Sequence, residues 1–273
     1  MKHHFVKTEN HARLTAAVRF MEERGSPSAC LCLLHGAPGV GKTRNISHWG
    51  AGNGAVLIKG HVGMSLSGLR WAISEKLGVR HRNNGTAEIE EQIAALKEGA
   101  VPLVFDEAQF GLAMRQGSVR AAGIEYLRDI AERAGSYALL VCHNSEVAGF
   151  SESQHIRTRI AHRGELYDAG EADTAAFVRY LCEVPVAAEV AQIVHRQTGG
   201  KFRLVENAIA ALERIGAIKG LARLEAADVG HVTLVVDHEK GLVPKVAAKK
   251  KARPAITPVP SPGGGGGEAG SVK

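Results

Sequence analysis

The sequence predicts an α/β fold with a mostly parallel sheet, helices on both faces and a small helical domain after it. Up to residue 142, short apolar runs of strand length alternate with segments whose apolar residues repeat at helical spacing. This alternation is typical of parallel sheets. After Glu171 the strand-like runs nearly stop, and three helical segments follow.

Four continuous apolar runs predict strands, because runs without polar alternation suit strands that are buried on both faces. They span residues 29–34, 55–58, 101–105 and 137–142. Apolar residues at helical spacing predict helices between and after these strands. The predicted helices cover residues 7–25, 65–77, 86–97, 120–134, 172–182, 187–198 and 202–215, with a further helix that begins at Lys42 or Thr43.

Composition and these elements divide the chain into four predicted parts. They are an N-terminal helical segment (1–28), a nucleotide-binding α/β core (29–170), a helical lid (171–237) and a basic tail rich in glycine and proline (238–273). Residues 240–273 hold seven basic residues against Glu268 alone, which accounts for the whole formal net charge of +6. The tail is predicted to be disordered, because it has too few apolar residues to offset the entropy lost on ordering.

Membrane and secreted classes do not fit the sequence. No apolar run approaches the roughly 20 residues of a membrane-spanning helix, and residues 1–10 are too polar for a secretory signal. Cys30 and Cys32 stand two apart, which is not the spacing of a zinc or redox motif. With Cys142 and Cys182, they are therefore expected to be buried free thiols of a cytoplasmic protein.

The residues after the first predicted strand match the G-x-x-x-x-G-K-T pattern at every fixed position, between a strand and a helix as the pattern requires. They are Gly36-Ala37-Pro38-Gly39-Val40-Gly41-Lys42-Thr43. Backbone N–H groups of such a loop form a nest for phosphate oxygens, and the helix N-terminus adds its dipole. Lys42 is expected to reach the β- and γ-phosphates of ATP, and Thr43 to supply a hydroxyl to Mg²⁺.

Two acids, Asp106 and Glu107, end the third predicted strand. In open α/β sheets the carboxyl ends of strands face the ligand crevice, so both side chains are expected near the phosphate loop. Asp106 would bind Mg²⁺, directly or through water, and Glu107 would polarise the water that attacks the γ-phosphate. A helix cap explains many Asp-Glu pairs, but a phosphate loop about 60 residues earlier favours the catalytic interpretation.

A polar residue after the fourth predicted strand is expected to contact the γ-phosphate or the attacking water. Asn144 is the first choice and His143 the second, with a simple strand-end turn as the alternative. A guanidinium can also neutralise charge that develops on the γ-phosphate. The candidates are Arg157, Arg159 and Arg163 after the fourth strand and Arg203 at the start of a lid helix. A solvated basic surface is the alternative for most of these arginines.

In their order along the chain, these motifs resemble those of the AAA+ ATPases. Four short segments resemble more narrowly the target-capture ATPases of transposing bacteriophages, the B proteins of Mu-like phages. They are Val6-Lys7-Thr8-Glu9-Asn10, Phe105-Asp106-Glu107-Ala108-Gln109, Thr158-Arg159-Ile160 and Gly199-Gly200-Lys201-Phe202-Arg203-Leu204-Val205. The resemblance covers about residues 5–235 and implies a P-loop AAA+ core followed by a helical lid.

The resemblance also implies a function. Such proteins bind duplex DNA with little sequence preference when ATP is bound, polymerise along it and pass it to a transposase as the integration target. The implied cofactors are ATP and Mg²⁺, and the implied partners are duplex DNA, a transposase and further copies of the chain, without a membrane. By position, Arg159 would act on the nucleotide of a neighbouring subunit, and Arg203 would be the lid sensor. The alternatives are a helicase-loader-like or a secretion-associated AAA+ ATPase.

Candidate DNA contacts are basic residues on loops and helix starts around the core, together with the tail, because phosphate contacts need only Lys or Arg. They are Lys59, Arg70, Arg115, Arg120, Lys249, Lys250 and Lys251. A solvated surface is the alternative for each of them.

Overall fold

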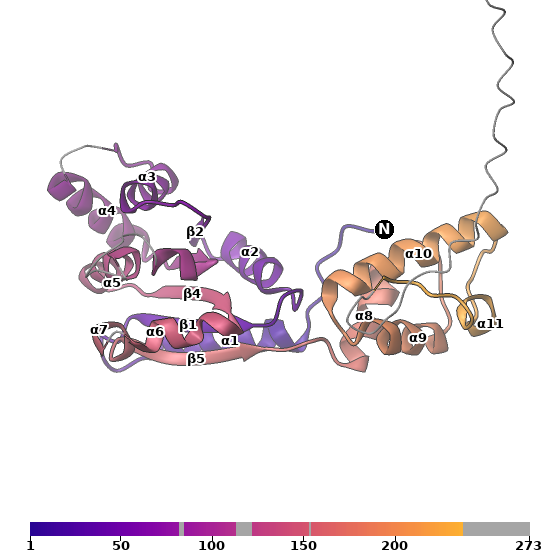
Figure 1. Cartoon of the computed structure of the whole chain (residues 1–273). Helices are drawn as coiled ribbons and strands as arrows, with labels where there is room; N and C mark the ends of the chain where they lie inside the picture. The colour runs from indigo at the N-terminus through magenta and orange to yellow at the C-terminus, as the bar shows by residue number, and fades with distance from the viewer. Residues whose placement is uncertain (82–84, 113–121, 153, 237–273) are drawn as a thin grey trace, which may run out of the picture.

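The computed structural model describes residues 1–81, 85–112, 122–152 and 154–236. Figure 1 shows an α/β part that ends with β5 and a helical part that follows it. Within the described residues the sheet has five strands in the order β2-β3-β4-β1-β5, and every neighbouring pair is parallel. The strands are β1 (Leu31–Gly36), β2 (Val56–Lys59), β3 (Leu103–Asp106), β4 (Ala138–His143) and β5 (Ile160–Leu166).

The predicted fold class is confirmed, because helices cover both faces of this parallel sheet. Successive side chains of a strand point to opposite faces of the sheet, so a strand that is apolar at every position can be buried on both faces. In β1, Leu31 and Leu33 join the cluster on one face, whereas Cys32 and Leu34 join the cluster on the other. The first face carries α3 (Leu66–Leu77), α4 (Gly85–Gly99) and α5 (Ala122–Ala134), and the second carries α1 (Glu9–Glu22) and α2 (Lys42–Gly52).

The edge strand β5 is the one strand of the described sheet that the sequence does not predict. Among the described strands it pairs with β1 alone, at the edge of the sheet, and most of its residues are only partly buried. Its residues include His162, Arg163 and Glu165, so it lacks the continuous apolar run by which a central strand is recognised. The other four strands are predicted correctly, with ends that differ by one or two residues.

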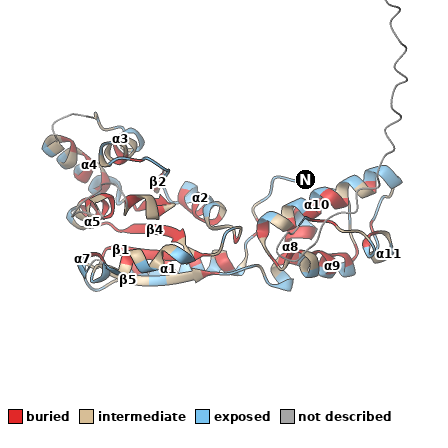
Figure 2. Cartoon of the chain, in the orientation of Figure 1, coloured by how far each residue is buried: buried red, intermediate tan, exposed pale blue. Residues whose placement is uncertain are grey.

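The helical part consists, in the described residues, of α8 (Glu171–Leu181), α9 (Ala188–Thr198), α10 (Phe202–Lys219) and α11 (Ala226–Val229). The three helices predicted here are confirmed. Their buried side chains form an apolar cluster of their own, and Figure 2 shows this burial along the inner faces of α8, α9 and α10. Val6, from the segment before α1, belongs to the same cluster. The exact domain boundaries stay a prediction.

Short helices complete the described chain: η1 (Ala108–Gly111), η2 (Asn144–Glu146), α6 (Val147–Glu152) and α7 (Gln154–Arg157). All four cysteines are buried and free, as predicted, and burial raises the pKa of the Cys32 thiol to about 12. None of the described helices is both long and apolar enough to cross a bilayer. The predicted tail, 238–273, lies outside the described residues.

Candidate nucleotide-binding site

The phosphate loop connects the end of β1 to the first turn of α2, in the predicted context. Gly39 and Gly41 have φ values of 86° and 85°, a left-handed conformation that glycine adopts without the strain of a side chain. This backbone gives the loop the turn that a phosphate nest needs. The N-terminus of α2, which begins at Lys42, adds the positive end of a helix dipole.

The ammonium group of Lys42 lies over this loop. Its Nζ atom donates to the carbonyl oxygens of Gly36, at 2.7 Å, and Ala37, at 3.0 Å. Burial lowers the pKa of Lys42, and the nearby carboxylates of Glu107 and Asp106 oppose that shift. A cation held by two neutral carbonyl groups can exchange them for phosphate oxygens, which offer it a stronger, charge-assisted bond.

Thr43 and Asp106 form the second contact of the site. Thr43 Oγ1 donates to Asp106 Oδ2 at 2.7 Å, and the backbone N–H of Glu107 donates to Asp106 Oδ1 at 3.1 Å. Asp106 is 4% exposed; burial raises its pKa and so does the charge of Glu107, against the hydrogen bond from Thr43. A hydroxyl beside a carboxylate is a donor set that suits Mg²⁺, so these residues fit the predicted ion.

A cleft of about 300 Å³ lies beside the loop. Its walls bring together side chains from the phosphate loop, from the end of β3, from the end of β4 and from α10. They include Lys42, Thr43, Glu107, His143 and Arg203. The carboxyl ends of neighbouring parallel strands therefore meet at one crevice, as the topology requires.

The two strand-end candidates occupy different places. His143 lines the cleft, whereas Asn144 is exposed and contacts His35 Nδ1, at 2.9 Å, and Glu165 Oε1, at 3.3 Å. β4 extends through His143, which pairs with Gly36, so the strand ends one residue later than the sequence predicts. The structure thus places the second choice, and not the first, at the crevice.

One nitrogen of the His143 ring has no partner among the described residues. Its Nδ1 atom lies 2.9 Å from Ser145 Oγ and 3.2 Å from the backbone nitrogen of Ser145. Its Nε2 atom is buried and has no hydrogen-bond partner among the described residues. A buried polar atom without a partner is costly, and a polar ligand that reaches Nε2 would remove this cost.

The predicted arginines separate into two groups. Arg203 lies in the cleft, on the first turn of α10. Arg159 precedes β5, and its carbonyl accepts from the N–H of Leu31, at the amino end of β1. The phosphate loop follows the opposite end of β1, so Arg159 cannot reach the cleft of its own chain. Its guanidinium lies 3.7 Å from Glu132.

Two of the candidate DNA contacts, Lys59 and Arg70, lie within the described residues. Lys59 is exposed at the end of β2. Arg70 forms an ion pair with the fully buried carboxylate of Glu88, and its own side chain is 18% exposed, so it is engaged inside the protein. The others, Arg115, Arg120, Lys249, Lys250 and Lys251, lie outside the described residues.

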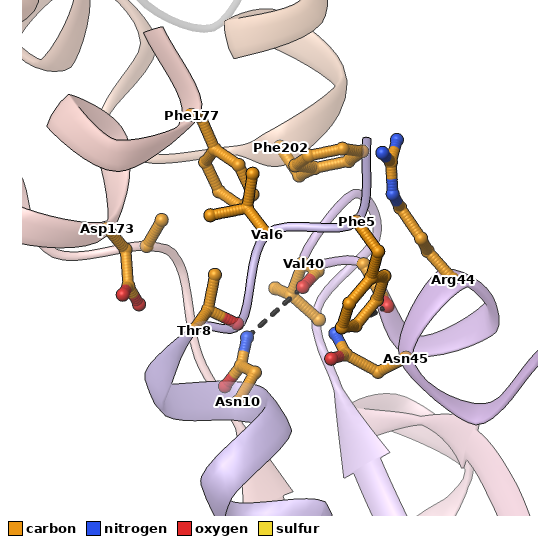
Figure 3. A pocket seen from close by; sticks show the side chains of 12 residues that line it. Phe5, Val6, Thr8, Asn10, Val40, Arg44, Asn45, Asp173, Phe177 and Phe202 are labelled. Atoms are coloured by element: carbon orange, nitrogen blue, oxygen red, sulfur yellow. Dashed lines mark hydrogen bonds between the residues drawn. The ribbon is translucent and has the colours of Figure 1, made fainter. Parts of the chain in front are cut away.

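A second, narrow cavity of about 20 Å³ lies on the other side of the phosphate loop, against the segment before α1 (Figure 3). Its apolar lining includes Val6, Val40, Phe177 and Phe202. Asn45 points into it from α2, one turn beyond the loop. The Asn45 amide donates through Nδ2 to the Gly41 carbonyl at 3.0 Å, and its Oδ1 is buried without a partner among the described residues. Asn45 is not among the site residues that the sequence predicts.

A parallel sheet with a phosphate loop after β1 and an acidic pair at the end of β3 defines a P-loop nucleotide-binding domain. Residues 27–148 match the model of a family described as AAA domain. The part of the chain from β1 to β4 is therefore an AAA-type P-loop ATPase domain. No curated protein matches the chain.

Three similar solved structures have the same fold. The Aeropyrum pernix ORC2 protein, in ADPNP-ADP complexes, is 14% identical with a TM-score of 0.55, over 85% of this chain and 69% of that one. RuvB from Thermotoga maritima, a Holliday junction branch migration motor, is 16% identical with a TM-score of 0.56, over 82% and 68%. Cdc6p from Pyrobaculum aerophilum is 16% identical with a TM-score of 0.53, over 81% and 64%. At such identities the likeness concerns the fold alone.

Proposed function

We propose that this protein is a Mg²⁺-dependent ATPase that hydrolyses ATP to ADP and phosphate. The observation that carries the proposal is the convergence of Lys42, Thr43 and Glu107 on one cleft, with Asp106 bonded to Thr43. Lys42 would bind the β- and γ-phosphates, and Thr43 with Asp106 would hold the ion. Mg²⁺, when bound, would neutralise charge on the phosphate oxygens.

Glu107 has the role of general base in this proposal. Its carboxylate would take a proton from the attacking water while the water oxygen bonds to the γ-phosphorus and the bond from that phosphorus to the ADP oxygen breaks. His143 Nε2 and the Arg203 guanidinium would donate to the γ-phosphate as its charge develops. The cleft supports these roles because all three side chains line it.

The narrow cavity in Figure 3 is the proposed place of the adenine base. Its apolar walls suit an aromatic ring, and it adjoins the phosphate loop at Val40 and Gly41. Because about 20 Å³ holds roughly one water, the base would enter only as Val6 and its neighbours move aside. Asn45 Oδ1, which has no partner in the part of the chain that the structure describes, would then accept from the 6-amino group of adenine.

We further propose that ATP binding assembles copies of the chain on duplex DNA, where they select a target for a partner transposase. The support is the resemblance of the four short segments to phage target-capture ATPases, together with a structural neighbour that is a Holliday junction branch migration motor. A helicase-loader-like or secretion-associated ATPase is the alternative. Co-sedimentation with duplex DNA, with and without ATP, distinguishes the proposed DNA-binding functions from a role in secretion.

The proposed ATPase is tested with two variants and one control. Lys42→Ala is expected to abolish ATP binding, because the phosphates lose their direct cation. Glu107→Gln is expected to bind ATP but to hydrolyse it at least ~100-fold more slowly, and Glu75→Gln, on the exposed face of α3, should match the unaltered chain. Normal turnover by Glu107→Gln would refute the catalytic assignment.

A further inference from the structure

The carboxylate of Glu107 has one side-chain partner among the described residues, and it comes from the turn that follows β3. Gln109 Nε2 donates to Glu107 Oε2 at 2.6 Å. Gln109 belongs to the short helix η1, which begins directly after Glu107. The Gln109 amide therefore contacts one oxygen of the Glu107 carboxylate, Oε2, and does not contact the other, Oε1.

The amide of Gln109 has only one orientation that fits this contact. An ionised carboxylate can only accept, so the NH₂ group must face Glu107, and the reverse orientation would put two oxygens together. Gln109 Oε1 is consequently buried, without a partner among the described residues. A glutamine that served only the packing of the turn would avoid an unsatisfied buried acceptor, because such a group destabilises the fold.

The backbone of Glu107 is also held in an uncommon conformation. Its φ and ψ are 55° and 45°, in the left-handed region that residues with a side chain seldom adopt. The β2–α3 connection lies against it: Gly60 N–H donates to the Asp106 carbonyl at 2.7 Å. A Cβ atom at Gly60 would be 2.5 Å from the Glu107 carbonyl oxygen, so only glycine permits this approach. The backbone is therefore fixed, while the side chain depends on Gln109 for its direction.

We propose that Gln109 is a positioning residue for hydrolysis, which orients the Glu107 carboxylate so that its second oxygen meets the attacking water. This inference rests on the proposed role of Glu107 as general base. Gln109 does not touch the nucleotide in this arrangement. Its loss should therefore change turnover and its pH dependence and leave ATP affinity unchanged.

Gln109→Leu keeps much of the side-chain volume and removes the donor. We expect its kcat to fall by about 10- to 100-fold, since small misplacements of a catalytic group have effects of this size. The Kd for ATP, from fluorescence of a labelled analogue, should stay within about twofold, because Lys42 and Thr43 keep their places. Gln192→Leu, on the exposed surface of α9, is the matched control and should turn over normally.

Gln109→Glu provides a readout that packing alone would not change. Two carboxylates within hydrogen-bond distance share a proton, so a base in such a pair is available only at higher pH. The acid limb of the kcat profile should move upward by about one pH unit or more. At fixed pH 7 this variant should be slower than the unaltered chain, with part of the loss recovered at pH 9.

The outcomes separate this inference from the proposed function. Normal hydrolysis by Glu107→Gln would refute the general-base role itself. With Glu107→Gln inactive, normal turnover by Gln109→Leu, or a Gln109→Glu profile that superposes on that of the unaltered chain, would refute the positioning role alone. Loss of ATP binding in both Gln109 variants would also refute it, because Gln109 would then support the fold of the site.

Discussion

Thr43 Oγ1 and Asp106 Oδ2 are 2.7 Å apart, although 63 residues separate them in the sequence. The bond joins the first turn of α2 to the end of β3. It also keeps a carboxylate that is 4% exposed beside the loop where phosphates would bind. We therefore expect this residue pair to affect the stability of the nucleotide-free protein and the binding of Mg²⁺ when nucleotide is present.

Asp106→Asn should stabilise the nucleotide-free protein at pH 8. Burial raises the pKa of Asp106, so its contribution to stability is present at low pH and is lost as the pH rises through the folded-state pKa. An amide stays neutral, donates to Thr43 Oγ1 and still accepts from the Glu107 N–H. The Tm should rise by about 2–4 °C, for roughly 1 kcal/mol, and the gain should shrink toward pH 4.

The same variant should lose the response of ATP affinity to Mg²⁺, because an amide is a poorer ligand for this ion than a carboxylate. Asp168→Asn, at an exposed site, is the control for both measurements. A lower Tm of Asp106→Asn at pH 8 would mean that the charged carboxylate is stabilised by its neighbours more than burial destabilises it.

The central strands β1, β3 and β4 could be predicted from the sequence because burial on both faces demands apolar residues at nearly every position. β5 could not, since most of its residues are only partly buried and its side chains include His162, Arg163 and Glu165. Its place in the sheet depends on backbone pairing with β1. Every residue can accept a backbone hydrogen bond and every residue except proline can donate one, so these bonds leave no pattern in the sequence.

The candidate site was predictable where a motif fixes the spacing, as for Lys42 and Asp106. The site was not predictable where it depends on the residue at which a strand ends. Because β4 ends at His143, that residue lines the cleft and Asn144 does not. Asn45 has a weak signal, a polar residue on the buried side of an amphipathic helix. Gln109 stands two residues after Glu107, and its contact with that carboxylate is a hydrogen bond that only the fold reveals.

Asn45 should make ATP bind more tightly than an analogue without the 6-amino group. The unaltered chain should bind purine riboside triphosphate about fivefold or more weakly than ATP, because the buried Asn45 Oδ1 then stays unsatisfied. In Asn45→Ala the two nucleotides should bind alike. The double-mutant cycle removes the separate effect of losing the Gly41 contact. Equal preference for ATP in both proteins would show that Asn45 does not contact the base.

His143→Ala should lower kcat by about 10- to 100-fold with little change in the Kd for ATP, since the loss of a donor to developing charge acts on the transition state. Asn144→Ala should stay within about twofold of the unaltered chain, because the Asn144 side chain contacts His35 and Glu165 outside the cleft. Both rates would come from single-turnover hydrolysis. The reverse order of effects would restore Asn144 as the group that contacts the γ-phosphate.

We expect Arg159 to act on the nucleotide of another copy of the chain. It lies at the amino end of the sheet, whereas its own cleft opens at the carboxyl ends of the strands. Arg159→Ala should therefore bind ATP normally and hydrolyse it at least ~10³-fold more slowly, as for other arginines supplied from a neighbour. Arg157 lies two residues earlier and is exposed. Arg157→Ala is the control variant, and its hydrolysis rate should stay normal if Arg159 is the arginine that acts.

Mixing provides the decisive measurement for Arg159. Lys42→Ala lacks a working cleft and keeps the arginine, while Arg159→Ala keeps the cleft and lacks the arginine, so a mixed assembly contains some complete sites. The mixture should hydrolyse ATP faster than either variant alone, and turnover per chain of the unaltered protein should rise with its concentration, because only assembled copies share sites. A rate independent of concentration, with a monomer in sedimentation when ATP and duplex DNA are present, would refute the trans role of Arg159 and the proposed assembly together.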